Sequence, residues 1–358
     1  MTQPISGRKH CNSLRLVAPA SRFDGKSGFQ SGRPRRQGPN VSSLTHAYHF
    51  DPTYGYTLDS LLRVDCPDEP EGFADFWRAR YRRALNTRPE PRLDNRRDWH
   101  RDYAIHDLAY RSTDDIAIGG WALIPKRGPV RRGVVVGHGY GGRDGPDFHL
   151  PVAEAAFLFP CFRGLSRSRR PPISDNPAFH VLHDIDKRDG YILGGCVEDL
   201  WLAVSALAEL FPETAGHVGY MGISFGGGIG ALALPWDERI RLAHLSVPTF
   251  GHVPLRLSLP TLGSGEAVRA YQSRHGHAME TLRYYDAACA ARRAAIPVHV
   301  AAALFDPVVA PPGQFAVYNA LPGPKELFVL DAGHFDYPRR AEQDRELLGA
   351  LETFFTPL

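Results

Sequence analysis

The sequence contains no uninterrupted apolar run of about 18 residues, the length that a membrane-spanning helix requires. A secretory signal is also missing, because the apolar stretch from Leu14 to Ala20 is brief and is broken by Arg15 and Pro19. We therefore expect neither a membrane span nor export. A hydrophobic content of 43% over 358 residues is sufficient for a large core and predicts a soluble globular protein.

Cysteine is scarce and dispersed. There are five cysteines, and no two of them are spaced as a Cys-x-x-Cys pair. This pattern argues against a disulfide framework and against a zinc site. We expect reduced thiols and a cytoplasmic location.

Positive charge is concentrated at the N-terminus. Residues 1–46 contain eight Lys or Arg and one Asp, a net charge of +7, so the other residues carry −4 of the total of +3. The segment is rich in Gly, Ser and Pro and has no apolar periodicity, which predicts a disordered basic tail before a single domain over residues 47–358. Because aromatic residues do not interleave with the basic ones, nucleic acid is not an expected partner.

The hydrophobic patterns indicate an α/β fold. A helix is predicted over residues 70–85, and strands around 103–110 and 116–124 open the sheet in antiparallel fashion. From Gly133 onward, short buried runs alternate with helical stretches, which is typical of a mostly parallel sheet with helices on both faces. The expected strands there are 134–136, 157–162, 218–221, 240–247, 297–305 and 326–330, and the expected helices are 151–156, 196–211, 281–291 and 342–355.

Two long connections interrupt this alternation. Residues 163–189 are predicted to form a polar loop. Residues 248–295 are rich in Pro, Gly and Leu and end in the predicted helix. Because most connections in compact domains are short, we interpret the second segment as a lid or binding excursion.

The stretch from His217 to Gly230 has the sequence of a nucleophile elbow. A buried run leads into Ser224, which lies between Gly222 and Gly226 in the pattern G-x-S-x-G. Glycine on both sides permits the tight strand-to-helix turn that raises a serine hydroxyl above the sheet edge. A Gly-rich turn with an incidental serine is the alternative, so partners are needed elsewhere in the chain.

The chain supplies an acid and a base in suitable places. Asp306 follows the predicted strand 297–305, and His334 lies in the loop after the strand 326–330. The order Ser, Asp, His is that of α/β-hydrolases, and residues at the carboxyl ends of parallel strands converge. Asp331 and Asp336 are alternatives for the acid, and we favour Asp306 because the acid normally follows an earlier strand.

An ester-cleaving serine also needs donors for the oxyanion. The backbone N–H of Phe225, directly after the nucleophile, is one candidate, and the N–H of Tyr140 in the loop after strand 134–136 is the other. We expect His138 to support this loop. Arg163 is expected to hold the loop below the site rather than to take part in the reaction.

A different class of protein is also compatible with one motif. Residues 137–142 match G-x-G-x-x-G between a strand and the predicted helix 151–156, and Arg163 is suitably placed for a nucleotide 2′-phosphate. A dinucleotide-binding oxidoreductase would, however, leave Ser224, Asp306 and His334 unexplained. A hydrolase-like binding protein without catalytic activity is the other alternative, and a complete triad argues against it.

Several motifs in register resemble the acetyl xylan esterase and cephalosporin C deacetylase family, which is carbohydrate esterase family 7 of the α/β-hydrolase superfamily. The resemblance runs from about Leu58 to the C-terminus. It rests on the helix 73–83, His138-Gly-Tyr140, Arg163-Gly164, the Ser224 elbow, Tyr284-Tyr-Asp286, Asp306-Pro-Val, Ala316-Val-Tyr-Asn319 and Gly333-His334. It implies a triad of Ser224, Asp306 and His334, oxyanion N–H groups from Tyr140 and Phe225, and removal of acetyl groups from small acetylated sugars and related esters. It also implies no metal or other cofactor and a homo-oligomer, often a hexamer.

Three positions depart from the family pattern. Leu165, Phe225 and Phe335 stand where the family usually has polar residues. Backbone donation by Phe225 does not depend on its side chain. The three changes nevertheless suggest that the surroundings of the site are less polar and less suited to a sugar than in the family. A carboxylesterase for bulkier acyl groups and an α/β-hydrolase peptidase therefore stay open as alternatives.

Overall fold

The computed structural model describes residues 44–358. The basic tail predicted for residues 1–46 lies outside the described residues, apart from its last three. None of the helices between residues 44 and 358 is long and apolar enough to cross a membrane.

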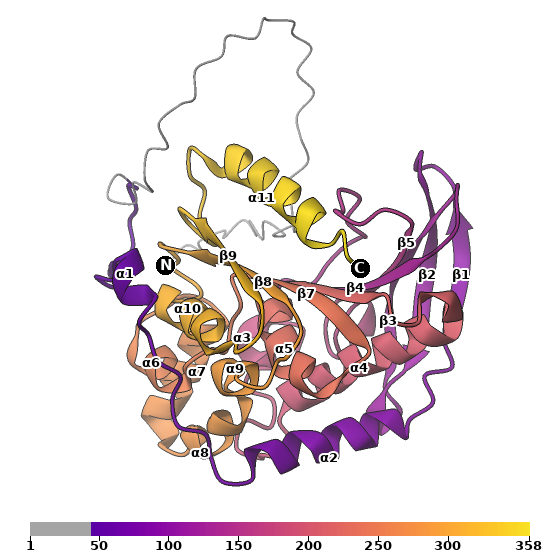
Figure 1. The fold of residues 1–358 in the computed structure, drawn as a ribbon. Coiled ribbons are helices and arrows are strands. Elements are labelled where there is room, and N and C mark those ends of the chain that lie inside the picture. The colour runs from indigo at the N-terminus through magenta and orange to yellow at the C-terminus, as the bar shows by residue number, and fades with distance from the viewer. Residues whose placement is uncertain (1–43) are drawn as a thin grey trace, which may run out of the picture.

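A nine-stranded sheet runs through the centre in the order β1-β2-β3-β5-β4-β6-β7-β8-β9 (Figure 1). The pairs β1–β2, β2–β3 and β3–β5 are antiparallel, and every pair from β5 through β4 to β9 is parallel. The strands are β1 (Arg92–Arg97), β2 (Tyr103–Arg111), β3 (Ala117–Pro125), β4 (Arg132–Gly137), β5 (Ala155–Pro160), β6 (Val218–Ile223), β7 (Ile240–Ser246), β8 (Val298–Ala303) and β9 (Lys325–Leu330). The predicted mostly parallel α/β-hydrolase sheet is confirmed.

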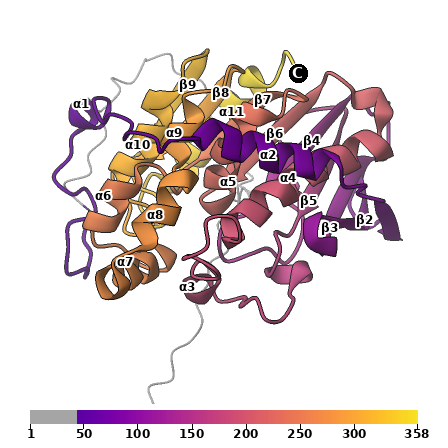
Figure 2. The same cartoon turned by 90° about the horizontal axis from the view of Figure 1, so that it is seen from below.

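Helices cover both faces of the sheet. The last helix, α11, lies on one face, and α2, α4, α5, α9 and α10 lie on the other, where α2 crosses beneath α4 (Figures 1 and 2). The helices are α1 (Leu58–Leu61), α2 (Phe73–Leu85), α3 (Pro177–His180), α4 (Ile192–Leu210), α5 (Phe225–Ala233), α6 (Val253–Ser258), α7 (Ser264–His275), α8 (Ala278–Leu282), α9 (Ala287–Ala291), α10 (Pro311–Ala320) and α11 (Arg340–Phe354). Helix α4 is buried nearly all round because it is covered by the sheet and by α2.

The structure differs from the sequence-based assignments in four places. The predicted helix 151–156 is wrong: Ala155 and Ala156 begin β5 and pair with Arg132 and Gly133 of β4, so sheet pairing overrides the local helix pattern. The predicted helix 281–291 is broken, because Asp286 caps a new helix, α9. The excursion 248–295 contains two further helices, α6 and α7. The edge strand β1 was not predicted, because its sequence has no alternation of apolar and polar residues.

A pair of histidines lies in the core between two parallel strands. His244 of β7 and His299 of β8 are register partners, and their Nδ1 atoms are 3.1 Å apart. Both side chains are buried, and the Nε2 atom of His244 has no hydrogen-bond partner among residues 44–358. Burial lowers the pKa of His244 well below its usual value and that of His299 to about 4. The two imidazoles are therefore neutral in the folded protein at pH 7.

This pair predicts acid sensitivity of the fold. A histidine in the unfolded chain takes up a proton near pH 6.5, whereas the folded pair resists protonation, so stability is complete above that pH and is lost as the pH falls towards about 4. We expect the free energy of unfolding in urea to be lower at pH 5 than at pH 7.5, by up to about 2 kcal/mol per histidine. The double variant His244→Gln/His299→Gln should show a smaller difference between the two pH values. An equal difference in both proteins would contradict this assignment.

Candidate active site

Ser224 lies in a strained turn at the start of α5. It is the N-cap residue of that helix, directly after β6, and its φ of 53° and ψ of −111° are unusual for a residue with a side chain. Its N–H donates to the carbonyl of Ser246 at 2.8 Å, and its own carbonyl accepts from Gly228 at 3.0 Å and from Thr249 at 3.2 Å. These backbone bonds to the neighbouring strand and loop hold the turn in place.

Close backbone approach explains the glycines around Ser224. A Cβ atom on Gly226 would lie 2.7 Å from the carbonyl carbon of Gly137, and one on Gly222 would lie 2.5 Å from the carbonyl oxygen of Gly226. The N–H of Gly226 also donates to the carbonyl of His138 at 2.9 Å. The start of α5 is thus packed directly against the loop that follows β4.

The structure brings the three predicted side chains into one hydrogen-bonded chain. Nε2 of His334 is 2.9 Å from Oγ of Ser224, and Nδ1 of His334 is 2.8 Å from Oδ2 of Asp306. The side chain of Asp306 is completely buried, that of His334 is 8% exposed, and Ser224 is 6% exposed. Because an ionised carboxylate only accepts, His334 donates from Nδ1 and leaves Nε2 to accept the serine proton.

The Asp306 carboxylate is held by four donors. Oδ1 accepts from the N–H groups of Val308 and Val309, both at 2.9 Å, and Oδ2 accepts from His334 and from Nε2 of Gln314 at 3.0 Å. Gln314 lies on α10, is fully buried, and also accepts from the N–H of Ala303. No sequence pattern indicates this role, since an isolated glutamine in a helix has no distinguishing pattern.

The two alternative acids point elsewhere. Asp331 interacts with Gln343 and Arg339, at 3.2 and 3.3 Å. Asp336 is exposed and faces Arg340. Among the carboxylates of residues 44–358, only that of Asp306 is hydrogen-bonded to His334.

Two N–H groups next to Ser224 are free to receive an oxyanion. The loop 137–142 passes close to the serine, because a Cβ atom on Gly139 would lie 3.9 Å from Cβ of Ser224. Within the described part of the chain, the N–H groups of Tyr140 and Phe225 donate to no other group. Phe225 is the first residue of α5, where N–H groups have no partner inside the helix and the helix dipole favours negative charge.

The Phe225 ring forms part of the core beneath this loop. It is fully buried and stacks on the Tyr140 ring with 4.1 Å between the centroids. Phe162 and Phe250 contact it edge-on. The aromatic side chain therefore supports the Tyr140 backbone from below.

His138 links the same loop to the sheet. Its Nε2 accepts from the N–H of Phe162 at 3.0 Å, and its Nδ1 is 2.7 Å from the carbonyl of Gly139. This pattern requires a neutral ring with the proton on Nδ1. Burial lowers the pKa of His138 to about 3, so the ring keeps this form across the neutral range.

Arg163 lies below the site in a buried ion pair. Its guanidinium is 2.7 Å from Oδ1 of Asp199 and also contacts the hydroxyls of Ser112 and Thr113. The N–H of Arg163 donates to Oδ2 of the same carboxylate at 2.9 Å. Burial opposes its charge, yet the adjacent Asp199 raises the pKa of Arg163 overall. Arg163 follows β5 and Asp199 lies on α4, so this ion pair, which uses both carboxylate oxygens of Asp199, connects the end of β5 to α4.

The geometry required for dinucleotide binding is not present at the loop 137–142. A turn and β5 follow the loop instead of the helix that would receive a pyrophosphate. Across residues 44–358, no group of three or more His, Cys, Asp or Glu side chains is arranged to hold a metal ion.

Comparisons with known proteins agree with this architecture. A family model described as acetyl xylan esterase matches residues 58–348. The structure is similar to the acetyl xylan esterase from Paenibacillus sp. R4, with 24% sequence identity, a TM-score of 0.68, and coverage of 82% of this chain and 99% of that chain. It is also similar to acetyl xylan esterase 1 from Thermoanaerobacterium sp. JW/SL YS485, with 19% identity, a TM-score of 0.68, and coverage of 84% and 99%. An acylaminoacyl peptidase from Pyrococcus horikoshii has 15% identity and a TM-score of 0.56, and the match covers 72% of this chain and 42% of that one. These likenesses show a common fold.

The contact between Asp306 and His334 depends on the absence of a side chain at position 333. A Cβ atom on Gly333 would lie 2.4 Å from Oδ2 of Asp306, the oxygen that accepts from His334. We expect Gly333→Ala to lower kcat/KM for 4-nitrophenyl acetate by about 10²-fold to 10⁴-fold, because the imidazole loses its orienting partner. Gly349→Ala is the matched control, since no atom of the described residues lies within 4 Å of a Cβ atom there. Equal activity of the two variants would contradict the assigned contact.

Proposed function

The chain belongs to the acetyl xylan esterase family and is a carboxylic ester hydrolase, and we propose that it removes acetyl groups from small O-acetylated compounds with Ser224 as the nucleophile. The hydrogen-bonded chain from Ser224 through His334 to Asp306 carries the proposal. A serine hydroxyl is a weak nucleophile unless a base removes its proton, and His334 is within hydrogen-bond distance to do so.

The first half of the reaction acylates the serine. Oγ of Ser224 attacks the ester carbonyl while Nε2 of His334 takes its proton. The negative charge that develops on the carbonyl oxygen is stabilised by the N–H groups of Tyr140 and Phe225, and Asp306 stabilises the imidazolium. His334 then returns the proton to the departing alcohol, which leaves an acetyl group on Ser224.

Water completes the second half. His334 removes a proton from a water molecule, which attacks the acyl carbonyl, and the same N–H groups stabilise the second oxyanion. Collapse of this intermediate releases acetate and returns the proton to Ser224. Loss of one donor from such a site costs roughly 10² to 10³ in rate.

We also infer a reducing compartment such as the cytoplasm. The four cysteines in the described region, Cys66, Cys161, Cys196 and Cys289, are free thiols. Two of them, Cys66 and Cys289, have their sulfur atoms 3.7 Å apart without a bond. The odd number and dispersed spacing of the cysteines in the sequence, with no Cys-x-x-Cys pair, support the proposal.

Replacement of the nucleophile tests the proposed reaction. We expect Ser224→Ala to lose at least about 10³-fold in kcat for 4-nitrophenyl acetate, because the other groups of the site act through this hydroxyl. Ser273→Ala, which alters an exposed serine on α7, is the control. We further expect the wild type to hydrolyse acetate esters faster than long-chain esters. Unchanged activity in Ser224→Ala would refute the mechanism, and a preference for long chains would refute the acetyl assignment.

A further inference from the structure

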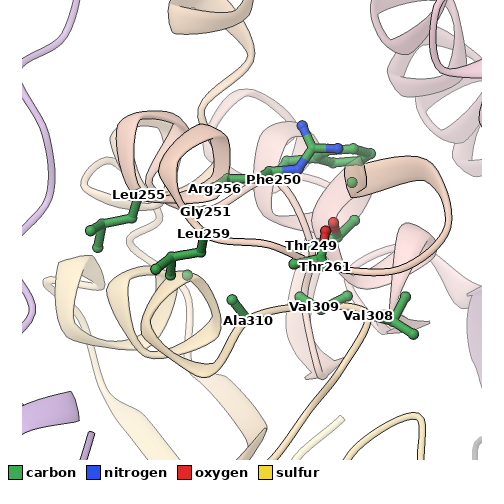
Figure 3. Close-up of a pocket in the computed structure, with 12 residues that line it drawn as sticks. Thr249, Phe250, Gly251, Leu255, Arg256, Leu259, Thr261, Val308, Val309 and Ala310 are labelled. Atoms are coloured by element: carbon green, nitrogen blue, oxygen red, sulfur yellow. The ribbon is translucent and has the colours of Figure 1, made fainter. Parts of the chain in front are cut away.

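A small cavity next to the proposed active site contains an arginine without an acidic partner. Arg256 lies on α6, and its guanidinium is 5.2 Å from the centroid of the Phe250 ring (Figure 3). Thr249, Thr261 and Val308 line the same cavity, which has a volume of about 20 Å³. That volume is sufficient for one water molecule or a chemical group of similar size.

Among residues 44–358, Arg256 is a half-buried arginine without a carboxylate partner. No Asp or Glu oxygen of residues 44–358 lies within 4.0 Å of its guanidinium, and the guanidinium donates no hydrogen bond within that region. By contrast, four buried or half-buried arginines each have a carboxylate partner; they are Arg80, Arg143, Arg163 and Arg239. The Arg256 side chain is half-buried. Its guanidinium donors are therefore available to an anion that a ligand brings.

Burial lowers the pKa of Arg256, and the charge of Asp286 partly opposes this effect. The carboxylate oxygens of Asp286, however, already accept hydrogen bonds from backbone N–H groups. Oδ1 accepts from the N–H groups of His252, Ala288 and Cys289, and Oδ2 accepts from that of Val253 at 2.5 Å. This carboxylate caps α9 and holds the start of α6. It is therefore committed to the backbone.

A second polar group in the cavity also lacks a partner. Thr261 is only 5% exposed, and its hydroxyl has no hydrogen-bond partner in the part of the chain that the structure describes. Buried hydroxyls are normally paired, because an unpaired one costs about 1–3 kcal/mol. An acceptor entering the cavity would satisfy this hydroxyl.

The walls of the cavity are bonded to the proposed catalytic residues. Thr249 donates its N–H to the carbonyl of Ser224, and Val308 donates its N–H to Asp306. Arg256 also lies over the Phe250 ring, which contacts the Phe225 ring edge-on, and Phe225 stacks on Tyr140. These ring contacts connect the arginine to the start of α5 and to the loop 137–142.

We propose that one oxygen of a carboxylate of the ester substrate enters this cavity, with Arg256 as the ion-pair partner of the carboxylate and Thr261 as an additional hydrogen-bond donor. The assignment rests on the proposed function. A guanidinium offers a planar set of donors that matches a carboxylate, and the Phe250 ring lies against the guanidinium of Arg256. The carboxylate belongs either to the alcohol part or to the acyl part of the ester.

Matched pairs of esters test the proposal. For the alcohol part, the pair is 4-acetoxybenzoate and 4-acetoxybenzamide; for the acyl part, it is the mono-4-nitrophenyl esters of succinic acid and of succinamic acid. We expect the wild type to have a higher kcat/KM for the anionic member of one pair. In Arg256→Gln the ratio of kcat/KM for the anionic ester to kcat/KM for the neutral ester should fall about tenfold to 100-fold, because a hydrogen bond to a charged group is lost. Arg256→Lys should retain part of the ratio.

Two controls separate this proposal from others. Arg274→Gln removes an exposed arginine from α7 and should leave the ratio unchanged, which excludes a general effect of net charge. Calorimetric binding of the alcohol-part and acyl-part pairs to Ser224→Ala needs no turnover, so it tests the cavity even if Ser224 is not the nucleophile. The proposal is overturned if the wild type prefers neither anionic ester and binds neither more tightly, or if Arg256→Gln retains the wild-type ratio.

Discussion

The hydrogen bond from His334 to Asp306 is the contact on which the arrangement of the proposed active site depends. It fixes the proton on Nδ1, so that Nε2 faces Ser224 as an acceptor. The carboxylate can serve this purpose because two backbone amides and the side chain of Gln314 hold it in one orientation. Gly333 leaves the space that the contact needs. Rigid positioning of this kind is what makes a buried triad effective.

The sheet and its loops keep the nucleophile in a conformation that it would not adopt alone. A positive φ at Ser224 is unfavourable by roughly 1–3 kcal/mol, and the surrounding hydrogen bonds maintain it. The loop 137–142 packs directly on the start of α5, with the Phe225 ring stacked beneath Tyr140. Buried His138 and Arg163 fix the ends of neighbouring strands. The interior thus supports the turn and the oxyanion loop together.

Local sequence patterns were informative where function requires a particular position at a strand end. Ser224, Asp306 and His334 could be recognised because each follows a buried run in the order of an α/β-hydrolase. Gln314 could not, because its contribution depends on tertiary contacts that no short pattern encodes. The incorrect helix at 151–156 has the same origin, since pairing with β4 decided the conformation. The same limit applies to Arg256, because no short pattern indicates that it has no carboxylate partner among residues 44–358.

Covalent labelling tests the central claim most directly, because it reports the activated nucleophile without requiring knowledge of the natural substrate. The wild-type protein would be treated with a fluorophosphonate and digested, and the modified peptide identified by mass spectrometry. The account predicts one phosphonyl group per chain, located on Ser224, and labelling that becomes much slower when His334 is replaced by Ala. Labelling at another residue, or an unchanged rate in His334→Ala, would contradict it.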